Sequence, residues 1–376
     1  MKKTILIFAI SLTSFSGFSE DWTVEMDGIT YRSENDSTCY VYKADLMIKE
    51  AIIPSEVNGH KVTEIHYYGF RNCDSLKYVS IPTSVTYIDD QAFTNCQSLS
   101  DIYIPESVNR MEAMAFWNCT SLVAINVAPE NQSYCSVDGV VFNKEQTEIL
   151  FMPAGKSGAY IIPEGITKLG SGSFSFSQLN SVTCPSSLQK IAAFCFLSAS
   201  YLEEVIFPDC CQVTEMGGMA FYLCKSLSAI SLPDSLERMG PSCFDSTGLK
   251  TIWLPKKVQL SAGEEFFNCM SLDEVHVQTD VIFGISYESS FGSHYPIEFH
   301  RYLYVPKGCR EKYETAKGWN HFLVLEEGQD RSEAGIQNIP TDSQDDSQYY
   351  DMLGRMHRID SCHEVRIKNG KKTLLR

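Results

Sequence analysis

The chain has 376 residues, a net charge of −16 and an ordinary hydrophobic share of 44%. Such acidity disfavours nucleic acid as a partner, because a phosphate backbone requires a basic face, and it equally disfavours adsorption to an anionic membrane. The length does not define a number of domains, because repeated sequence runs through most of the chain.

Residues 1–19 are predicted to be a secretory signal peptide. A basic start is followed by an apolar run over 5–12, and the small residues Gly17 and Ser19 come just before a plausible cleavage site at Glu20. The apolar run is too short for a durable transmembrane anchor. We therefore expect an exported chain with no transmembrane segment after cleavage of the signal.

Residues 20–53 are predicted to form an N-terminal cap. Short apolar strands are expected over 29–31, 39–42 and 51–53. A solenoid needs such a cap because its end turn would otherwise expose core residues to water.

Residues 54–277 repeat one pattern, in which a strand ending in Ile-Pro leads to Ser-Val, then to Ala-Phe and then to Cys-x-Ser-Leu. Most steps between the Phe anchors are 22, 23 or 25 residues, and one is 58. A period of roughly 20–29 residues with Leu and Ile at fixed offsets is typical of a leucine-rich solenoid, which presents a long surface rather than one deep pocket. The anchors are Phe70, Phe93, Phe116, Phe174, Phe196, Phe221, Phe244 and Phe266.

A single repeat predicts the local structure of each turn. The alternation of Ile102 and Ile104 indicates a half-buried strand, which Pro105 ends by removing a hydrogen-bond donor. Residues 114–119 are expected to form a short helical or 3-10 turn that drives Phe116 inward. The predicted fold is a leucine-rich repeat solenoid, a right-handed β/α superhelix of mostly short parallel strands, capped at both ends.

The long step between two anchors is predicted to hold an insertion, at about residues 128–158. Apolar runs over 138–142 and 147–151 flank the polar residues 143–146, a pattern typical of a β-hairpin.

Fourteen cysteines in an exported chain would ordinarily indicate disulfides. Several of them, however, fill one repeat slot, which Ser177 and Ala199 fill in other repeats, so the slot requires a small side chain rather than a sulfur bond. We predict buried free thiols that behave as small hydrophobic groups. The cysteines in this slot are Cys73, Cys96, Cys119, Cys224 and Cys269.

The last part of the chain departs from the repeat. Residues 278–325 are predicted to be an irregular last repeat and a C-terminal cap with Trp319 and Phe322 in its core. Residues 326–348 carry seven acidic residues against one Arg and are expected to be a flexible acidic linker. Residues 349–376 reverse the charge and form a separate segment.

The repeats, written Ile-Pro-x-Ser-Val-x-x-Ile-x-x-x-Ala-Phe-x-x-Cys-x-Ser-Leu, resemble the BspA-like leucine-rich repeats of secreted bacterial surface proteins. The hairpin over 136–144 and the ending over 304–309 are also similar to that family, and the resemblance covers about residues 28–325. It implies the solenoid fold and export. For function it implies adhesion to host matrix proteins, host cells or other bacteria.

The segments 350–355 and 365–372 resemble the C-terminal sorting tail of Bacteroidetes type IX secretion. The Gly-Ile/Leu-Tyr that usually precedes the last strand of such tails is replaced here by residues 363–365. A small β-hairpin without a sorting role is the alternative interpretation.

No motif for catalysis is found. The chain lacks HExxH, GxSxG, a Gly-rich phosphate loop and a Walker motif, so we expect no enzyme and no cofactor. It also lacks a CxxC pair, and His276, His294 and His300 do not have metal-ligand spacing, so no metal site is predicted.

The alternation of each repeat strand identifies positions that face outward from the sheet. Nothing in folding requires large residues there, and exposed aromatic side chains are favoured anchors of interfaces. The alternative is that these side chains stack on one another and shield the sheet. The candidate partner-binding residues are Tyr78, Asp101, Tyr103, Glu204, Ile206, Trp253, Glu274, His276 and Tyr304.

The sequence therefore favours a secreted or outer-surface interaction protein, an adhesin for extracellular host or bacterial protein or glycan, whose oligomeric state is left open. One alternative is a protein associated with glycan processing, which would require a pair of carboxylates in a cleft. Asp101 and Glu204 are several repeats apart and do not form such a pair. The other alternative is a purely structural envelope component.

Overall fold

The computed structural model describes residues 22–260, 263–282, 285–286, 290–292 and 301–327, together with the backbone of four short strands beyond residue 347. The expected signal peptide and most of the expected acidic linker lie outside the described residues.

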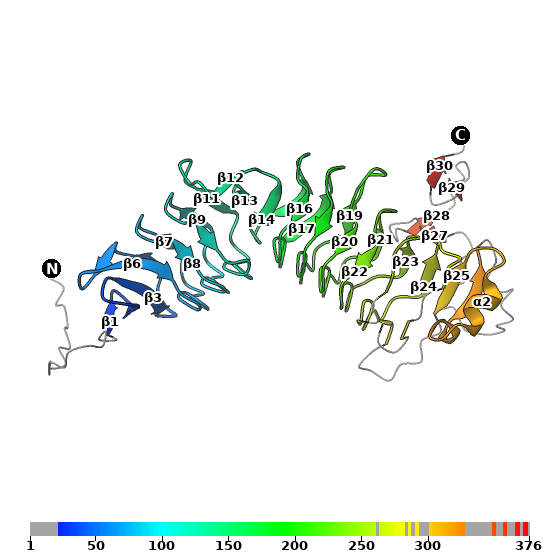
Figure 1. Cartoon of the computed structure of the whole chain (residues 1–376), viewed down its shortest axis with the longest axis horizontal. Coiled ribbons are helices and arrows are strands. Elements are labelled where there is room, and N and C mark those ends of the chain that lie inside the picture. The colour runs from blue at the N-terminus through cyan, green and yellow to red at the C-terminus, as the bar shows by residue number, and fades with distance from the viewer. Residues whose placement is uncertain are drawn as a thin grey trace.

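The chain is an elongated, arched β-solenoid whose turns follow one another from one end of the molecule to the other (Figure 1). Each regular turn contributes one strand to each of two rows, because its apolar residues recur at two places in the repeat. We call the first row the front sheet. Its strands are β4 (Glu50–Ile52), β7 (Tyr78–Ser80), β9 (Asp101–Ile104), β11 (Ala124–Val127), β15 (Ser157–Ile161), β17 (Gln178–Thr183), β19 (Glu204–Ile206), β21 (Ala229–Ser231), β23 (Thr251–Leu254), β24 (Glu274–Val277), β25 (Tyr302–Val305) and β26 (Leu323–Glu326).

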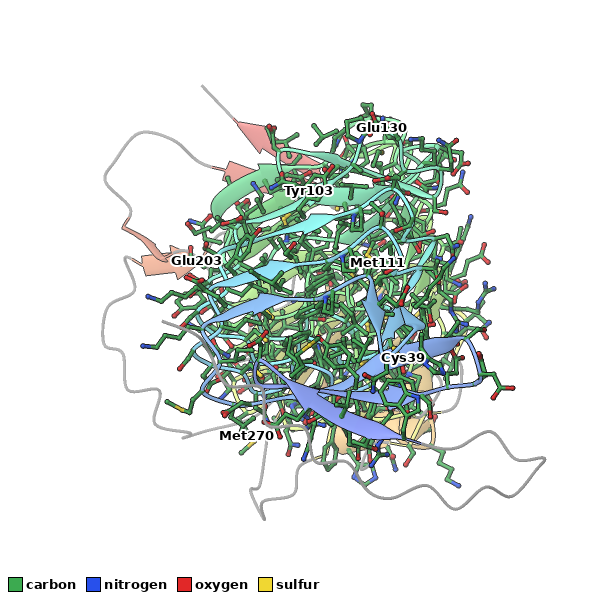
Figure 2. All side chains as sticks on the ribbon, turned by 90° about the vertical axis from the view of Figure 1, so that its left-hand side faces the viewer. Cys39, Tyr103, Met111, Glu130, Glu203 and Met270 are labelled. Carbon is green, nitrogen blue, oxygen red and sulfur yellow. The ribbon has the colours of Figure 1, made fainter. Side chains whose placement is uncertain are left out.

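The second row, which we call the back sheet, consists mostly of strands of two residues. Within each row, most neighbouring strands are parallel and pair residue by residue, for example Ile102 of β9 with Ile125 of β11 and Ile191 of β18 with Met216 of β20. The pairing is interrupted between β7 and β9, between β11 and β15 and between β19 and β21 of the front sheet, and between β10 and β14 of the back sheet. The back-sheet strands are β6 (His60–Ile65), β8 (Tyr87–Ile88), β10 (Arg110–Met111), β14 (Glu148–Phe151), β16 (Lys168–Leu169), β18 (Lys190–Ile191), β20 (Glu215–Met216) and β22 (Arg238–Met239). In the view along the solenoid, Tyr103 marks the front sheet and Met111 marks the back sheet (Figure 2).

The ends of the array differ from the repeats. At the N-terminal end β1 (Thr23–Met26), β2 (Ile29–Ser33) and β3 (Thr38–Ala44) are antiparallel, β3 then pairs with β6 in parallel, and β5 (Glu56–Val57) lies beside β6. At the other end the helix α2 (Arg310–Thr315) and the 3-10 helix η1 (Trp319–His321) close against the last turns, with Trp319 and Tyr313 fully buried. Beyond them lie two antiparallel pairs, β27 (Gln348–Tyr350) with β28 (Met356–Arg358) and β29 (Val365–Lys368) with β30 (Lys371–Leu374).

The Phe anchors form a spine inside the solenoid, as the repeat predicted. All eight are buried, and most successive rings stack, with 5.1 Å between the centroids of Phe70 and Phe93 and 5.0 Å between those of Phe221 and Phe244. This spacing follows from the separation of adjacent strands, which is about 4.8 Å. The stacked rings therefore have the same spacing as the strands around them. The stack is interrupted at the insertion, where Phe116 meets Phe151 edge to face.

The cysteines of the repeat slot are buried free thiols, which confirms that interpretation. The Cys96 thiol donates to the Phe70 carbonyl over 3.2 Å, and the Cys119 thiol donates to the Phe93 carbonyl over 3.0 Å. Burial raises the pKa of Cys73 to about 12, so its thiol remains protonated at neutral pH. Each sulfur thus fills a small site and satisfies a carbonyl of the preceding turn.

The expected short helical or 3-10 turns within the repeats are hydrogen-bonded turns instead. Over residues 114–119 the chain drives Phe116 inward as predicted, but Asn118 has φ 56°. A residue in the left-handed region cannot continue a right-handed helix. The chain therefore reverses within a few residues and returns to the next strand.

The inserted segment forms a three-stranded antiparallel unit of β12 (Tyr134–Val137), β13 (Val140–Asn143) and β14. Both faces of β13 are buried. Val141 and Phe151 belong to the core on the N-terminal side, whereas Val140 and Phe142 belong to the core on the C-terminal side. The unit therefore divides the solenoid interior into two cores.

Within the described residues, no helix has the length and apolar character that crossing a membrane requires.

Candidate functional site

The outward residues of the front sheet form two parallel rows, because strand pairing places equivalent positions side by side. Asp101 pairs with Ala124 in one row, and Tyr103 pairs with Asn126 in the other. The candidate residues therefore share one face, but they extend along the length of the solenoid rather than gathering in a cleft. Asp101 and Glu204 are separated by β11, β15 and β17, so they form no carboxylate pair.

The N-terminal part of this face is open to solvent. Tyr78 and Tyr103 each have 53% of their surface exposed, and Ile52 has 70% exposed. These three residues lie on the neighbouring strands β4, β7 and β9, and Asp101 is exposed beside Tyr103. We call Ile52, Tyr78, Asp101 and Tyr103 the exposed front patch.

Two further candidates lie in the middle of the face. Ile206 on β19 is 40% exposed, and Glu204 on the same strand is half-buried. Ile161 on β15 is 74% exposed and is separated from Ile206 by Thr183 of β17. Exposed apolar side chains therefore continue along the face past the insertion, but they are isoleucines rather than tyrosines.

The C-terminal part of the face is covered, which corrects the expectation that its residues face solvent. His276 and Tyr304 are only 7% and 9% exposed, and Trp253 is half-buried. The His276 ring stacks on Trp253 with 3.8 Å between centroids and on Tyr304 with 4.4 Å between centroids. Strand β26 then adds Leu325, fully buried, beside Tyr304. Here the side chains shield the sheet, which is the alternative that the sequence left open.

Two carboxylates hold His276 within this stack. Its Nδ1 lies 2.9 Å from Glu327 Oε1, and its Nε2 lies 3.6 Å from Glu274 Oε2. Burial lowers the pKa of His276, but its hydrogen bonds to Glu274 and Glu327 outweigh burial, and the pKa lies above its usual value. Glu274 and His276 therefore stabilise the end of the sheet instead of forming a free binding surface.

The repeats identify a family. The family described as BspA type leucine rich repeat region matches the chain in six copies, over residues 39–149 and 167–291. The chain belongs to the BspA-type leucine-rich repeat family. No curated protein matches the chain.

Solved structures are similar to this BspA-type chain. A leucine-rich cell surface protein from Faecalibacterium prausnitzii A2-165 is 28% identical with a TM-score of 0.54, and the match covers 61% of this chain but only 60% of that protein. The pneumococcal vaccine antigen PcpA is 18% identical with a TM-score of 0.55, and the match covers 83% of this chain and all of that one. The second likeness concerns the fold alone.

In the BspA-type repeat, the front positions vary while the inward positions remain apolar. The sequence analysis identified the outward row from this alternation, but it did not include Ile52 and Ile161 among the candidates, although both are more exposed than Tyr103. The same alternation contained that signal, because both residues occupy the outward row.

Proposed function

We propose that the chain is an exported, cell-surface interaction protein that binds an extracellular protein or glycan through the exposed front patch. The observation that carries the proposal is the exposure of Tyr78 and Tyr103 on neighbouring strands. Burying a large aromatic side chain is favourable, and an exposed Tyr gives an interface both apolar area and a hydroxyl group. An adhesin is the member of this class that we favour.

The neighbouring side chains suit a partner with polar groups. Asp101 lies two residues before Tyr103 on the same strand, and Asn126 pairs with Tyr103 on the next strand. A tyrosine ring bordered by a carboxylate and an amide can pack against an apolar surface while it accepts and donates hydrogen bonds. Both protein and glycan partners fit this chemistry.

The comparison with the F. prausnitzii protein supports the proposed location, because that protein is described as a cell surface protein. The signal peptide expected over residues 1–19 agrees with this location. We also propose that residues 349–376 are a type IX sorting tail, because the segments 350–355 and 365–372 resemble such tails. Deleting that segment and fractionating the cells tests it, because unchanged surface display would exclude a sorting role.

The experiment for the binding function uses an array of host matrix proteins, mucins and glycans, probed with the wild-type chain and with a Tyr78→Ser/Tyr103→Ser variant. We expect saturable binding of the wild type and at least about tenfold weaker binding of the variant. Tyr201→Ser is the matched control, because Tyr201 is 63% exposed but lies outside the strands of the front sheet.

Equal binding by the wild type and the double variant would exclude the exposed front patch. Binding to no member of the array by a folded wild-type chain would contradict the adhesin proposal and favour a structural envelope role.

A further inference from the structure

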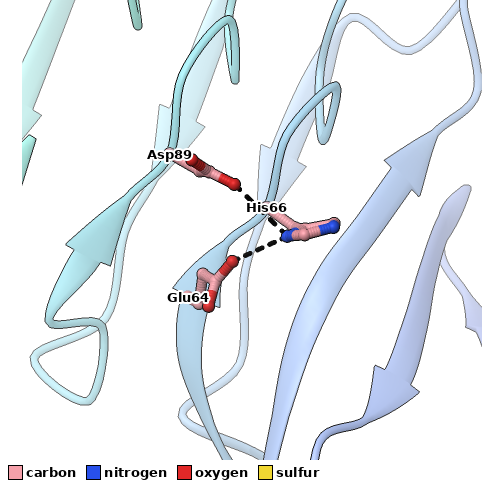
Figure 3. Close-up of side chains that lie close together, drawn as sticks. All are labelled: Glu64, His66 and Asp89. Atoms are coloured by element: carbon pink, nitrogen blue, oxygen red, sulfur yellow. Dashed lines mark hydrogen bonds and ion pairs between the residues drawn. The ribbon is translucent and has the colours of Figure 1, made fainter. Parts of the chain in front are cut away.

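Three side chains converge on the back sheet, away from the exposed front patch. His66 Nδ1 lies 2.7 Å from Glu64 Oε1 and 3.4 Å from Asp89 Oδ2 (Figure 3). One potential ligand atom from each residue lies within 4.8 Å of the other two. Three atoms that can all donate a lone pair thus point to one small volume, at the junction of the first two regular turns.

The repeat itself shows that these side chains are additions to the basic fold. His66, Asp89 and Glu112 occupy one repeat position, at which the N–H donates to a strand carbonyl of the preceding turn. The later turns place a glycine or alanine there: Gly170, Ala192, Gly217 and Gly240.

Close packing explains the small residues in the later turns. A Cβ at Gly217 would lie 2.3 Å from the Ala193 nitrogen, and one at Gly240 would lie 2.3 Å from the Gly218 nitrogen. The first turns have instead made room for ionisable side chains. Packing therefore does not require a histidine and a carboxylate at this position.

The surroundings hold Asp89 in place. Its Oδ1 accepts hydrogen bonds from the Tyr87 hydroxyl over 2.6 Å and from the Asp90 N–H over 2.7 Å, and its Oδ2 accepts one from the Tyr67 N–H over 3.1 Å. Outer contacts of this kind orient carboxylate ligands in metal sites. The Tyr40 ring lies 4.8 Å from that of His66 and limits its movement.

The charge around the cluster favours a cation. Glu64, Asp89 and Glu112 carry three negative charges, and Arg110, which binds Glu112 Oε1 through Nε over 2.8 Å, carries one positive charge. A positive charge between the Glu64 and Asp89 carboxylates would offset part of this negative charge.

We propose that Glu64, His66 and Asp89 form a divalent metal site that links the first two turns of the solenoid. One imidazole and two carboxylates suit a metal of the Zn²⁺ type, and three protein ligands leave coordination positions for water or for a group from a partner. The His66 side chain is 40% exposed, so such a position is accessible from solvent. The ligands come from β6, from the residue after it and from the residue after β8, so the metal fastens adjacent turns.

The test is calorimetric titration of the full chain with Zn²⁺, with Co²⁺ as a spectroscopic probe. We expect saturable binding that weakens at least about tenfold in His66→Ala and in Glu64→Gln, together with a Co²⁺ spectrum that lacks thiolate charge-transfer bands. Metal should also raise the midpoint of thermal unfolding of the wild type and leave that of His66→Ala unchanged.

Glu215→Gln is the matched control, because Glu215 lies at an outward position of the back sheet but is paired with Lys190 and Arg238. It should bind Zn²⁺ as the wild type does. Far-ultraviolet circular dichroism without metal verifies that every variant is folded. The proposal is overturned if the folded wild type shows no saturable binding, if both ligand variants bind equally well, or if thiolate bands identify a cysteine such as the exposed Cys210 as the ligand.

Discussion

The two ends of the front sheet use the same repeat positions in opposite ways. At the N-terminal end Tyr78 and Tyr103 are half exposed, whereas at the C-terminal end His276 and Tyr304 are buried by stacking. The strand alternation is the same at both ends, so alternation determines which way a side chain faces but not whether neighbouring side chains cover it. A binding surface on this fold depends on the residues one turn away.

The largest loss of stability should come from substitutions in the solenoid interior, where the cores on the two sides of the insertion are built alike. Phe93→Ala and Phe244→Ala each remove a stacked, fully buried ring, and each should lower the free energy of unfolding by about 3–5 kcal/mol. Denaturant titration measures this loss, and Tyr201→Ala, at an exposed position, should change it by less than about 0.5 kcal/mol. A cost below about 1 kcal/mol in only one half would show that the interiors also differ.

Substitutions on the front sheet should lower the free energy of unfolding by less, and by different amounts at its two ends. Tyr304→Ser should cost about 2–4 kcal/mol, because Tyr304 is buried between His276 and Leu325. Tyr103→Ser should cost less than about 0.5 kcal/mol, because Tyr103 is exposed. Thermal and denaturant unfolding of both variants measure the difference. Similar costs at the two positions would contradict the distinction between an open and a covered end.

The smallest predicted effect is a pH dependence of stability that arises from His276, at the covered end of the front sheet. The pKa of His276 is raised in the folded chain, so its stabilising contribution is fully present below the unfolded value of about 6.5 and is lost as the pH rises through the folded pKa. The difference in unfolding free energy between the wild type and His276→Gln should therefore be larger at acidic than at alkaline pH, and below about 2 kcal/mol. Unfolding midpoints across neutral pH test this.

Glu327→Gln provides an independent measure of the same contact, because Glu327 Oε1 lies 2.9 Å from His276 Nδ1. It should reduce the pH dependence without removing the stacked rings. An unchanged pH dependence in both variants would mean that His276 does not contribute in the charged form.

The repeating features were predicted correctly from the sequence, because the residues that produce them recur at the same offset in many repeats. The inward Phe anchors and the small slot that holds Cys96 and Cys224 follow directly from the period. The covering of His276 was not predictable in this way, because its partner Glu327 is 51 residues away and lies outside the repeat.

The cluster of Glu64, His66 and Asp89 escaped the sequence analysis for a related reason. Motif searches look for ligands a few residues apart, whereas His66 and Asp89 are separated by one whole repeat. Aligning the turns and asking where the glycine or alanine of Gly170 and Ala192 is replaced by an ionisable residue would have found them.

The inserted unit of β12, β13 and β14 has a consequence for how such a chain can evolve. Strand β13, buried on both faces, separates an N-terminal core from a C-terminal core, so most repeats contact only turns of their own half. Unequal recombination between similar repeats in the gene can then remove or duplicate a whole turn in one half without changing the junction. The length of the C-terminal part of the solenoid can therefore vary between descendants, while the N-terminal part, with the exposed front patch, is inherited unchanged.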